Sequence, residues 1–323
     1  MGSDQKYIPV EIRTFRNATR DITFDVFLML SDDNFAHVFS RTTGLDYKRL
    51  AHYIHKGVQH LYIKPTDLKA YKAFISKTAN QIFQDPNTPQ EKKIATLLNM
   101  TEQNMTEIFT QVQVPEETAK NTMQVVQNYV KLMFENPKSL TLILRLVSHG
   151  DYLYYHAIAT ATFSMFIAKA TGQFNKRMLE IVGLGGFLHD IGCTQLSSEV
   201  VNSEDDLSEE QWAEMRKHPS IGLKMLEEAP NIPDEVRYIV YQHHEQPSGN
   251  GYPNKLRGPK IYYPAKIVSI ADAFSALISK RPFRPAYKVE EAVDIMKNEV
   301  GKFDSQLIKI VEQIFVKPVK KAA

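Results

Sequence analysis

The apolar residues that follow Pro89 recur at helical spacing, and no strand-like alternation interrupts them. Residues 89–112 and 115–134 each place apolar side chains three and four positions apart, as on one face of a helix. From Pro137 onward, turn residues such as Gly172 separate further helices of ordinary length. We therefore expect most of this chain to fold as packed helices.

The first 85 residues have a different pattern. Runs of β-branched and aromatic residues bounded by turn residues indicate strands, and two amphipathic stretches indicate helices. The predicted strands are 7–12, 22–28, 35–39 and 61–64, and the predicted helices are 46–55 and 65–83. This segment is expected to be a compact α+β unit with a small sheet.

Together these patterns predict a multidomain α+β protein, in which a small N-terminal α/β unit precedes an all-α domain. We divide it into a regulatory domain at 1–85, a helical connector at 86–136 and a helical domain at 137–323. The apolar stripes of the connector are typical of core packing or of a dimer seam. A homodimer and a monomer that packs these stripes against residues 1–85 are equally compatible with the sequence.

Composition and charge narrow the class of protein. The 323 residues carry a formal net charge of +2, a balance that does not favour a nucleic-acid polymer as partner. The single Cys193 excludes an intramolecular disulfide, and the first residues lack the apolar core of a signal peptide. The longest apolar run, 140–144, is far shorter than the roughly 20 residues that span a bilayer. We expect a cytoplasmic protein without membrane insertion.

Two histidine-rich elements lie in the helical region, namely His189-Asp190 and, within the run HHEQPSGNGYP, His243-His244. Imidazole and carboxylate groups bind zinc, iron or manganese. Adjacent residues on a helix point about 100° apart, so both members of a pair reach one site only at a helix end. A single histidine is more often a core or surface residue, whereas an ordered set is hard to attribute to chance. The candidate ligands are His156, His189, Asp190, His218, His243, His244 and Asp272.

Residues 150–285 resemble the HD-GYP branch of the HD-domain metal-dependent phosphohydrolases. The segment His189–Gly192 resembles the HD signature of that family, and His243–Pro253 resembles its HHE and GYP signatures. Further similar segments, in the same order and at similar spacing, are Leu207–Trp212 before His218-Pro219, Ala271–Phe274 and Arg281–Arg284. The resemblance covers a little under half of the chain and does not include the first 85 residues.

The resemblance implies hydrolysis of the bacterial second messenger cyclic di-GMP by a binuclear metal site with a bridging hydroxide as nucleophile. Two divalent ions roughly 3.5–4 Å apart stabilise both the attacking and the leaving oxygen at phosphorus. The implied ions are iron or, as the alternative, manganese. All seven candidate residues are implied as ligands, with Asp190 bridging the ions, and His189 and Asp190 are also the implied catalytic residues.

Three further residues are candidate contacts to the dinucleotide. Arg281 and Arg284 follow Asp272, and a guanidinium group binds phosphate oxygens in a bidentate manner. An ordinary solvated turn is the alternative for both. Tyr252, in the Gly-Tyr-Pro turn, is expected to contact a guanine or a phosphate oxygen, or else to pin its loop against the helices.

Four positions depart from the pattern of the family. Tyr152 stands where members with three metals have a glutamate ligand, which predicts two metals here. Cys193 stands where most members have lysine, so a positive charge beside the phosphate is missing and stabilisation of the transition state should suffer. Ser248 and Ser275 replace acidic residues and are expected to affect loop rigidity and ligand orientation. We expect an intact metal site with low activity.

Three functions stay open at this point. The first is a cyclic di-GMP phosphodiesterase whose N-terminal domain binds an unknown regulatory ligand or partner. The second is a receptor for cyclic di-GMP or for a partner protein that has lost efficient catalysis, which Cys193 favours. The third is a hydrolase of another phosphate ester, which the turn Gly251–Pro253 disfavours.

Overall fold

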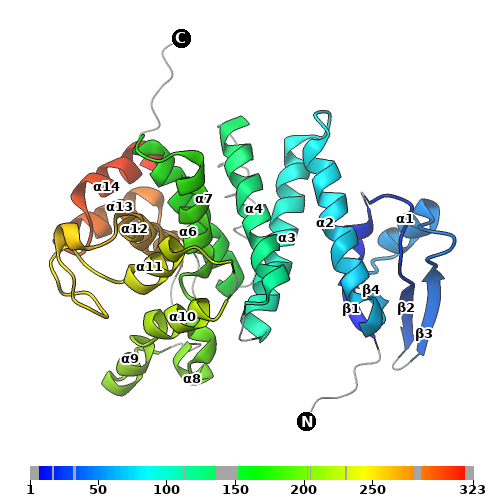
Figure 1. The fold of residues 1–323 in the computed structure, drawn as a ribbon, viewed down its shortest axis with the longest axis horizontal. Coiled ribbons are helices and arrows are strands. Elements are labelled where there is room, and N and C mark those ends of the chain that lie inside the picture. The colour runs from blue at the N-terminus through cyan, green and yellow to red at the C-terminus, as the bar shows by residue number, and fades with distance from the viewer. Residues whose placement is uncertain are drawn as a thin grey trace. The chain divides into compact units, whose positions relative to one another are not determined.

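The computed structural model describes residues 7–16, 18–31, 34–111, 114–135, 152–201, 203, 205–229, 231–279 and 285–316, with the backbone alone at 110–111 and 152–155 (Figure 1). The chain separates into two compact units, Met1–Thr96 and Leu97–Ala323, and the boundary falls within helix α3 (Gln90–Gln111). The division into three parts at 85 and 136 stays a prediction. The apolar run 140–144 lies outside the described residues.

The first unit contains a small antiparallel sheet, as the sequence predicted. Its strands are β1 (Ile8–Glu11), β2 (Val26–Ser31), β3 (Asn34–Phe39) and β4 (His60–Ile63), in the order β1-β4-β2-β3. Strand β2 begins at Val26 rather than at residue 22. The reason is that Phe24 is fully buried against Phe15 and Phe74, with ring centroids 6.3 and 5.3 Å away, and therefore fills the core instead of extending the ladder.

Two helices complete the described part of the first unit before α3. Helix α1 (Tyr47–His55) begins at Asp46, whose side chain accepts hydrogen bonds from the backbone N–H groups of Lys48 and Arg49. Helix α2 (Leu68–Gln84) follows a 3-10 turn at Pro65–Asp67. The observed helix therefore begins three residues after the start that the sequence predicted. A second 3-10 turn, Ile12–Phe15, follows β1.

In the second unit the described residues form helices joined by turns and loops, without a strand, in agreement with the sequence pattern. Its α-helices are α4 (Glu116–Glu135), α6 (Tyr152–Ala170), α7 (Lys176–Leu188), α8 (Ser198–Val201), α9 (Glu209–Met215), α10 (His218–Glu227), α11 (Asp234–Gln242), α12 (Tyr263–Ile278), α13 (Val289–Asn298) and α14 (Ser305–Val311). Short 3-10 turns lie at η3 (Ile191–Gln195) and η4 (Gly258–Lys260), and a π-helical turn follows at η5 (Glu312–Val316). No helix among the described residues has the length and hydropathy needed to cross a bilayer.

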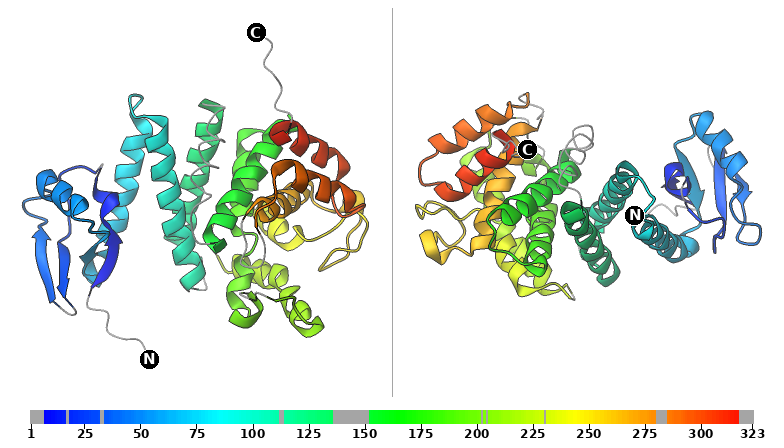
Figure 2. Two further views of the ribbon diagram at one scale, coloured as in Figure 1. Left: turned by 180° about the vertical axis from the view of Figure 1, so that it is seen from behind. Right: turned by 90° about the horizontal axis from the view of Figure 1, so that it is seen from above.

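Helices α6, α7 and α12 pack side by side, with α11 against α7 and α10 against η3 (Figures 1 and 2). Two glycines set these close approaches. A Cβ atom on Gly186 would lie 2.6 Å from the Cα atom of Ala161, and one on Gly192 would lie 2.0 Å from the carbonyl oxygen of His218. Side chains larger than hydrogen would push α7 from α6 and η3 from α10. These contacts bring the ends of α7, α10 and α11 to one region beside α6 and α12.

Candidate metal centre

The structure brings all seven predicted ligands together in two neighbouring groups. In each group the potential ligand atoms lie within 4.8 Å of one another. The Asp190 group consists of Asp190, His218, His243 and His244, and the Asp272 group consists of His156, His189 and Asp272. The seven residues come from α6, the end of α7, the start of α10, the end of α11, and α12.

Both adjacent pairs sit at helix ends, as their spacing required. Helix α7 ends at Leu188, so His189 is its C-cap and Asp190 follows it. Helix α11 ends at Gln242, so His243 is its C-cap. Because the backbone changes direction there, both members of each pair can face the same space.

Three of the histidines are oriented by carbonyl oxygens of their own helical turn. The Nδ1 atoms of His189, His218 and His243 lie 2.8, 2.8 and 2.7 Å from the carbonyl oxygens three residues earlier in the chain. A carbonyl oxygen only accepts hydrogen bonds, so each Nδ1 carries the hydrogen. Each Nε2 therefore directs a lone pair into the centre when the ring is neutral, which is the arrangement that metal-binding histidines use.

Asp190 lies between the two groups, and each of its carboxylate oxygens faces one of them. Its Oδ2 atom is 3.1 Å from His189 Nε2 and 3.9 Å from His156 Nε2. Its Oδ1 atom is 3.4 Å from His218 Nε2 and 3.7 Å from His243 Nε2. A carboxylate in this position can serve two cations at once.

Two features of the arrangement of these side chains fit bound cations. The Nε2 atoms of His218 and His243 lie only 3.2 Å apart, although hydrogens on the other ring nitrogens leave lone pairs on both when the rings are neutral. The Nε2 atom of His189 is buried and has no hydrogen-bond partner, in spite of its short distance to Asp190. Imidazole nitrogens and carboxylate oxygens in this mixture suit iron, manganese and zinc.

His156 is oriented differently, through a side chain on another helix. Its Nδ1 atom is 3.0 Å from the hydroxyl oxygen of Ser275, which is fully buried. The Ser275 hydroxyl donates to the carbonyl oxygen of Asp272 and lies 2.9 Å from the hydroxyl of Thr160. On its other side, His156 Nε2 is 3.0 Å from Asp272 Oδ1. The sequence predicted that Ser275 affects ligand orientation. In the structure it contacts His156, a member of the Asp272 group, directly.

The charges of the centre shift its pKa values in opposite directions. Burial disfavours a charge on His189, but the carboxylates of Asp190 and Asp272 outweigh burial and raise the pKa of His189 to about 9. Burial lowers the pKa of His218 to about 4 and the pKa of His244 well below its usual value. Burial raises the pKa of Asp190, yet His189 outweighs it and holds that pKa well below the usual range. The ionised carboxylate of Asp190 thus faces the neutral imidazoles of His218 and His244. At His189 the carboxylates favour a positive charge, which a bound cation can supply in place of the proton.

The Gly-Tyr-Pro loop folds back onto the Asp190 group. Buried Glu245 accepts hydrogen bonds from the backbone N–H groups of Asn254 (2.6 Å) and Leu256 (2.8 Å). Gly251 approaches so closely that a Cβ atom there would lie 2.5 Å from the carbonyl oxygen of His244. The Tyr252 ring stacks on His244, with centroids 4.7 Å apart. The sequence contained Glu245 but no signal for its role, because its partners are backbone groups of the loop.

The remaining predicted positions are less involved in the centre. Cys193 is buried and belongs to neither group, and burial together with nearby carboxylates raises the pKa of its thiol above the usual value. Ser248 contacts the turn before α14, where its N–H donates to the carbonyl oxygen of Gly301. The side chain of Tyr152 lies outside the described residues, as do Arg281 and Arg284.

Several known proteins are similar to this chain in sequence or in fold. Residues 148–307 match the family model of the HD domain. A cyclic di-GMP phosphodiesterase of Pseudomonas aeruginosa is 27% identical over 188 residues, which cover 58% of this chain and 45% of that protein. This is an HD-GYP domain protein. It is also 29% identical over 185 residues to a 3'3'-cGAMP-specific phosphodiesterase of Vibrio cholerae, with 56% of this chain and 42% of that one covered.

The HD-GYP domain protein spans less than half the length of these two relatives. Its fold is similar to that of Bd1817, a HDG"Y"P protein from Bdellovibrio bacteriovorus, with a TM-score of 0.68 at 21% identity. That similarity covers 95% of this chain and 99% of the other. The shared fold therefore extends beyond the HD domain into the N-terminal unit.

Proposed function

We propose that the HD-GYP domain hydrolyses the phosphodiester bond of cyclic di-GMP with two divalent metal ions. The observation that carries the proposal is the position of Asp190, whose two oxygens face two separate groups of imidazole and carboxylate ligands. A paired site of this kind suits phosphodiester hydrolysis, because both the attacking and the leaving oxygen need stabilisation. Relatives named as cyclic di-GMP and cGAMP phosphodiesterases support the substrate class.

The residues present fit two ions, which we propose to be iron or, as the alternative, manganese. His156, His189 and Asp272 would hold one ion together with Asp190 Oδ2, and His218, His243 and His244 would hold the other together with Asp190 Oδ1. When bound, divalent ions of this kind lower the pKa of a water molecule and neutralise charge at phosphorus. The protein itself fixes the ligand set and its orientation.

The carboxylates mark the open side of the centre. The side chains of Asp190 and Asp272 are 22% and 18% exposed, whereas His189 and His218 are 0% and 2% exposed. Substrate is therefore expected to approach past the carboxylates and the half-buried Tyr252. Burial raises the pKa of Tyr252, so its hydroxyl stays protonated at neutral pH and can donate a hydrogen bond to a phosphate oxygen or a guanine acceptor. Arg281 and Arg284 stay proposals as further phosphate contacts.

The test is a direct turnover assay. Purified full-length protein, loaded anaerobically with iron or manganese, is incubated with cyclic di-GMP, and the nucleotides are separated by chromatography. We expect a linear product, and we expect none from His189→Ala or Asp190→Ala. Binding of cyclic di-GMP without turnover would instead support the receptor function that Cys193 favours. Faster turnover of 3'3'-cGAMP or of an unrelated phosphate ester would reassign the substrate.

A further inference from the structure

Arg216 and Trp212 form an exposed pair next to the Asp190 group. The guanidinium carbon of Arg216 lies 5.6 Å from the centroid of the Trp212 ring, within the range of a cation–π contact. Trp212 is 43% exposed although it is a large apolar residue. Among the described residues, no carboxylate forms an ion pair with Arg216. An exposed guanidinium without an acidic partner is available to an anionic ligand.

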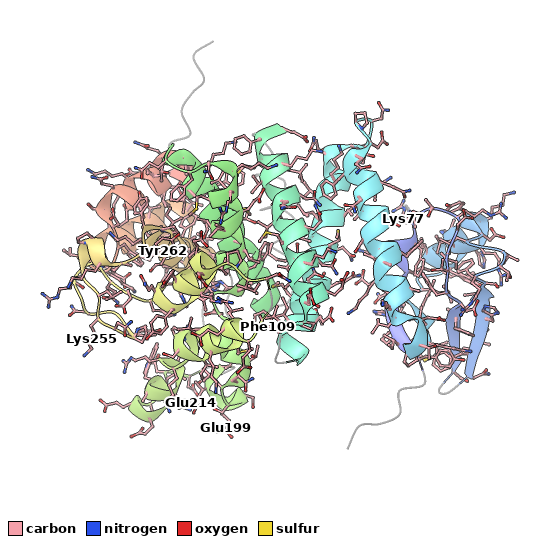
Figure 3. All side chains as sticks on the ribbon, in the orientation of Figure 1. Lys77, Phe109, Glu199, Glu214, Lys255 and Tyr262 are labelled. Atoms are coloured by element: carbon pink, nitrogen blue, oxygen red, sulfur yellow. The ribbon has the colours of Figure 1, made fainter. Side chains whose placement is uncertain are left out.

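The backbone that carries this pair is fixed relative to the metal centre. Arg216 is the C-cap of α9, and its N–H donates to the carbonyl oxygen of Trp212 at 3.0 Å. The carbonyl oxygen of the preceding residue, Met215, accepts from Nδ1 of His218 at 2.8 Å. Helix α9 is held in turn by Glu214, which accepts from the N–H of Ser197 at 2.8 Å (Figure 3 labels Glu214). Arg216 therefore stands two residues from a candidate ligand on an anchored segment.

Two adjacent cations on this segment act on different neighbours. Burial and nearby carboxylates raise the pKa of the Tyr252 hydroxyl, and the charge of Arg216 opposes that rise. A hydrogen bond from Ser197 lowers the pKa of Glu214, and the charge of Lys217 adds to that effect. The geometry places the segment that carries Arg216 beside the Gly-Tyr-Pro loop, because Arg216 precedes His218 by two residues and the ring centroids of His218 and Tyr252 are 6.3 Å apart.

We propose that Arg216 binds a phosphate oxygen of the nucleotide at this centre and that Trp212 positions its guanidinium. Arginine suits this role because its planar donors bind phosphate oxygens in pairs. The carboxylates at the open side repel an anionic substrate, so a fixed positive charge there favours binding. The identity of the ligand as a cyclic dinucleotide rests on the proposed function, whereas the site itself rests on the placement of Arg216, Trp212 and Tyr252.

The test compares Arg216→Gln with Lys217→Gln, which removes the neighbouring exposed charge. Both are prepared as full-length, metal-loaded protein, and KM and kcat for cyclic di-GMP are measured together with metal content. Loss of a charge-assisted hydrogen bond should raise KM about tenfold or more in Arg216→Gln. Metal content should stay at the wild-type value, and Lys217→Gln should change KM by less than about twofold. Equal effects of both variants, or an Arg216→Gln effect confined to metal content, would overturn the proposal.

Trp212 is tested by non-additivity. Trp212→Ala should raise KM less than Arg216→Gln does. Trp212→Phe, which keeps an aromatic ring, should have a KM close to the wild-type value. The KM of the double variant Trp212→Ala/Arg216→Gln should be no higher than that of Arg216→Gln alone. Additive effects would show that Trp212 does not act through Arg216.

A wild-type protein without turnover would contradict the proposed function but would still test Arg216. Calorimetric titration of the metal-loaded protein with cyclic di-GMP then replaces the assay, and Arg216→Gln should weaken binding about tenfold relative to Lys217→Gln. If cyclic di-GMP does not bind, inorganic phosphate is the probe, and the same difference is expected. Equal affinities of both variants for the bound probe would refute the role of Arg216.

Discussion

The two ligand groups of the centre are held in different ways. In the Asp190 group, His218 and His243 are each oriented by a carbonyl oxygen three residues earlier in the chain. In the Asp272 group, His156 is oriented by the hydroxyl of Ser275, a residue 119 positions away on another helix. His189 of the Asp272 group is also oriented by a local carbonyl oxygen, so the difference lies in His156, whose orientation depends on the packing of α6 against α12.

This difference has a consequence for mutation. A carbonyl oxygen of the backbone is present whatever side chain a residue carries, so orientation of His218 and His243 tolerates substitution around them. Orientation of His156 relies on two side chains, Ser275 and Asp272. The Asp272 group should therefore be the more sensitive of the two.

The largest expected effect comes from the residue that the two groups share. Asp190→Ala removes a carboxylate oxygen from each group and should abolish most metal binding, whereas Asp272→Ala should remove metal from its own group alone. We expect about two metal ions per chain in the wild type, close to none in Asp190→Ala and about one in Asp272→Ala. Metal content is measured after loading and desalting, with circular dichroism as the control for folding. Equal losses in both variants would contradict a shared Asp190.

A smaller effect is expected from Ser275→Ala. Without the hydroxyl, His156 loses the group that orients its ring, and the affinity of the Asp272 group for metal should fall about ten- to a hundredfold. The Asp190 group should be unchanged. Competition with a metallochromic chelator separates the two affinities, and Ser248→Ala, whose backbone hydrogen bond to Gly301 survives, is the matched control. A uniform weakening of both affinities would contradict independent orientation.

The smallest expected effect is a change in the thermal stability of the chelator-treated protein with pH. Although burial opposes it, Asp190 and Asp272 raise the pKa of His189 from 6.5 to about 9. The folded state therefore holds this proton more tightly than the unfolded state, so the resulting stability is fully present below about pH 6.5 and is lost as pH rises through about 9. The melting temperature should decline across this window, and His189→Gln should remove that decline. Parallel melting curves for the two proteins would contradict the assigned shift.

Much of the fold was predictable from local patterns. Helical spacing after Pro89 predicted the helices of the second unit, and runs of β-branched and aromatic residues between turn residues predicted the small sheet. Strand β2 was misplaced at its start, because the burial of Phe24 against Phe74 is a contact between distant residues that no local pattern contains. The 3-10 turn before α2 was missed for a related reason, since helical spacing does not distinguish one short turn type from another.

The sequence by itself determined which residue types are available to bind metal and that both adjacent pairs had to lie at helix ends, since neighbouring side chains on a helix diverge. Only the tertiary structure decided how the seven residues divide into two groups, that each oxygen of Asp190 faces one of them, and that Ser275 and Glu245 support the centre. The physical reason is distance along the chain. Helix ends follow from local backbone geometry, whereas contacts such as that between His156 and Ser275 exist only once α6 and α12 have packed.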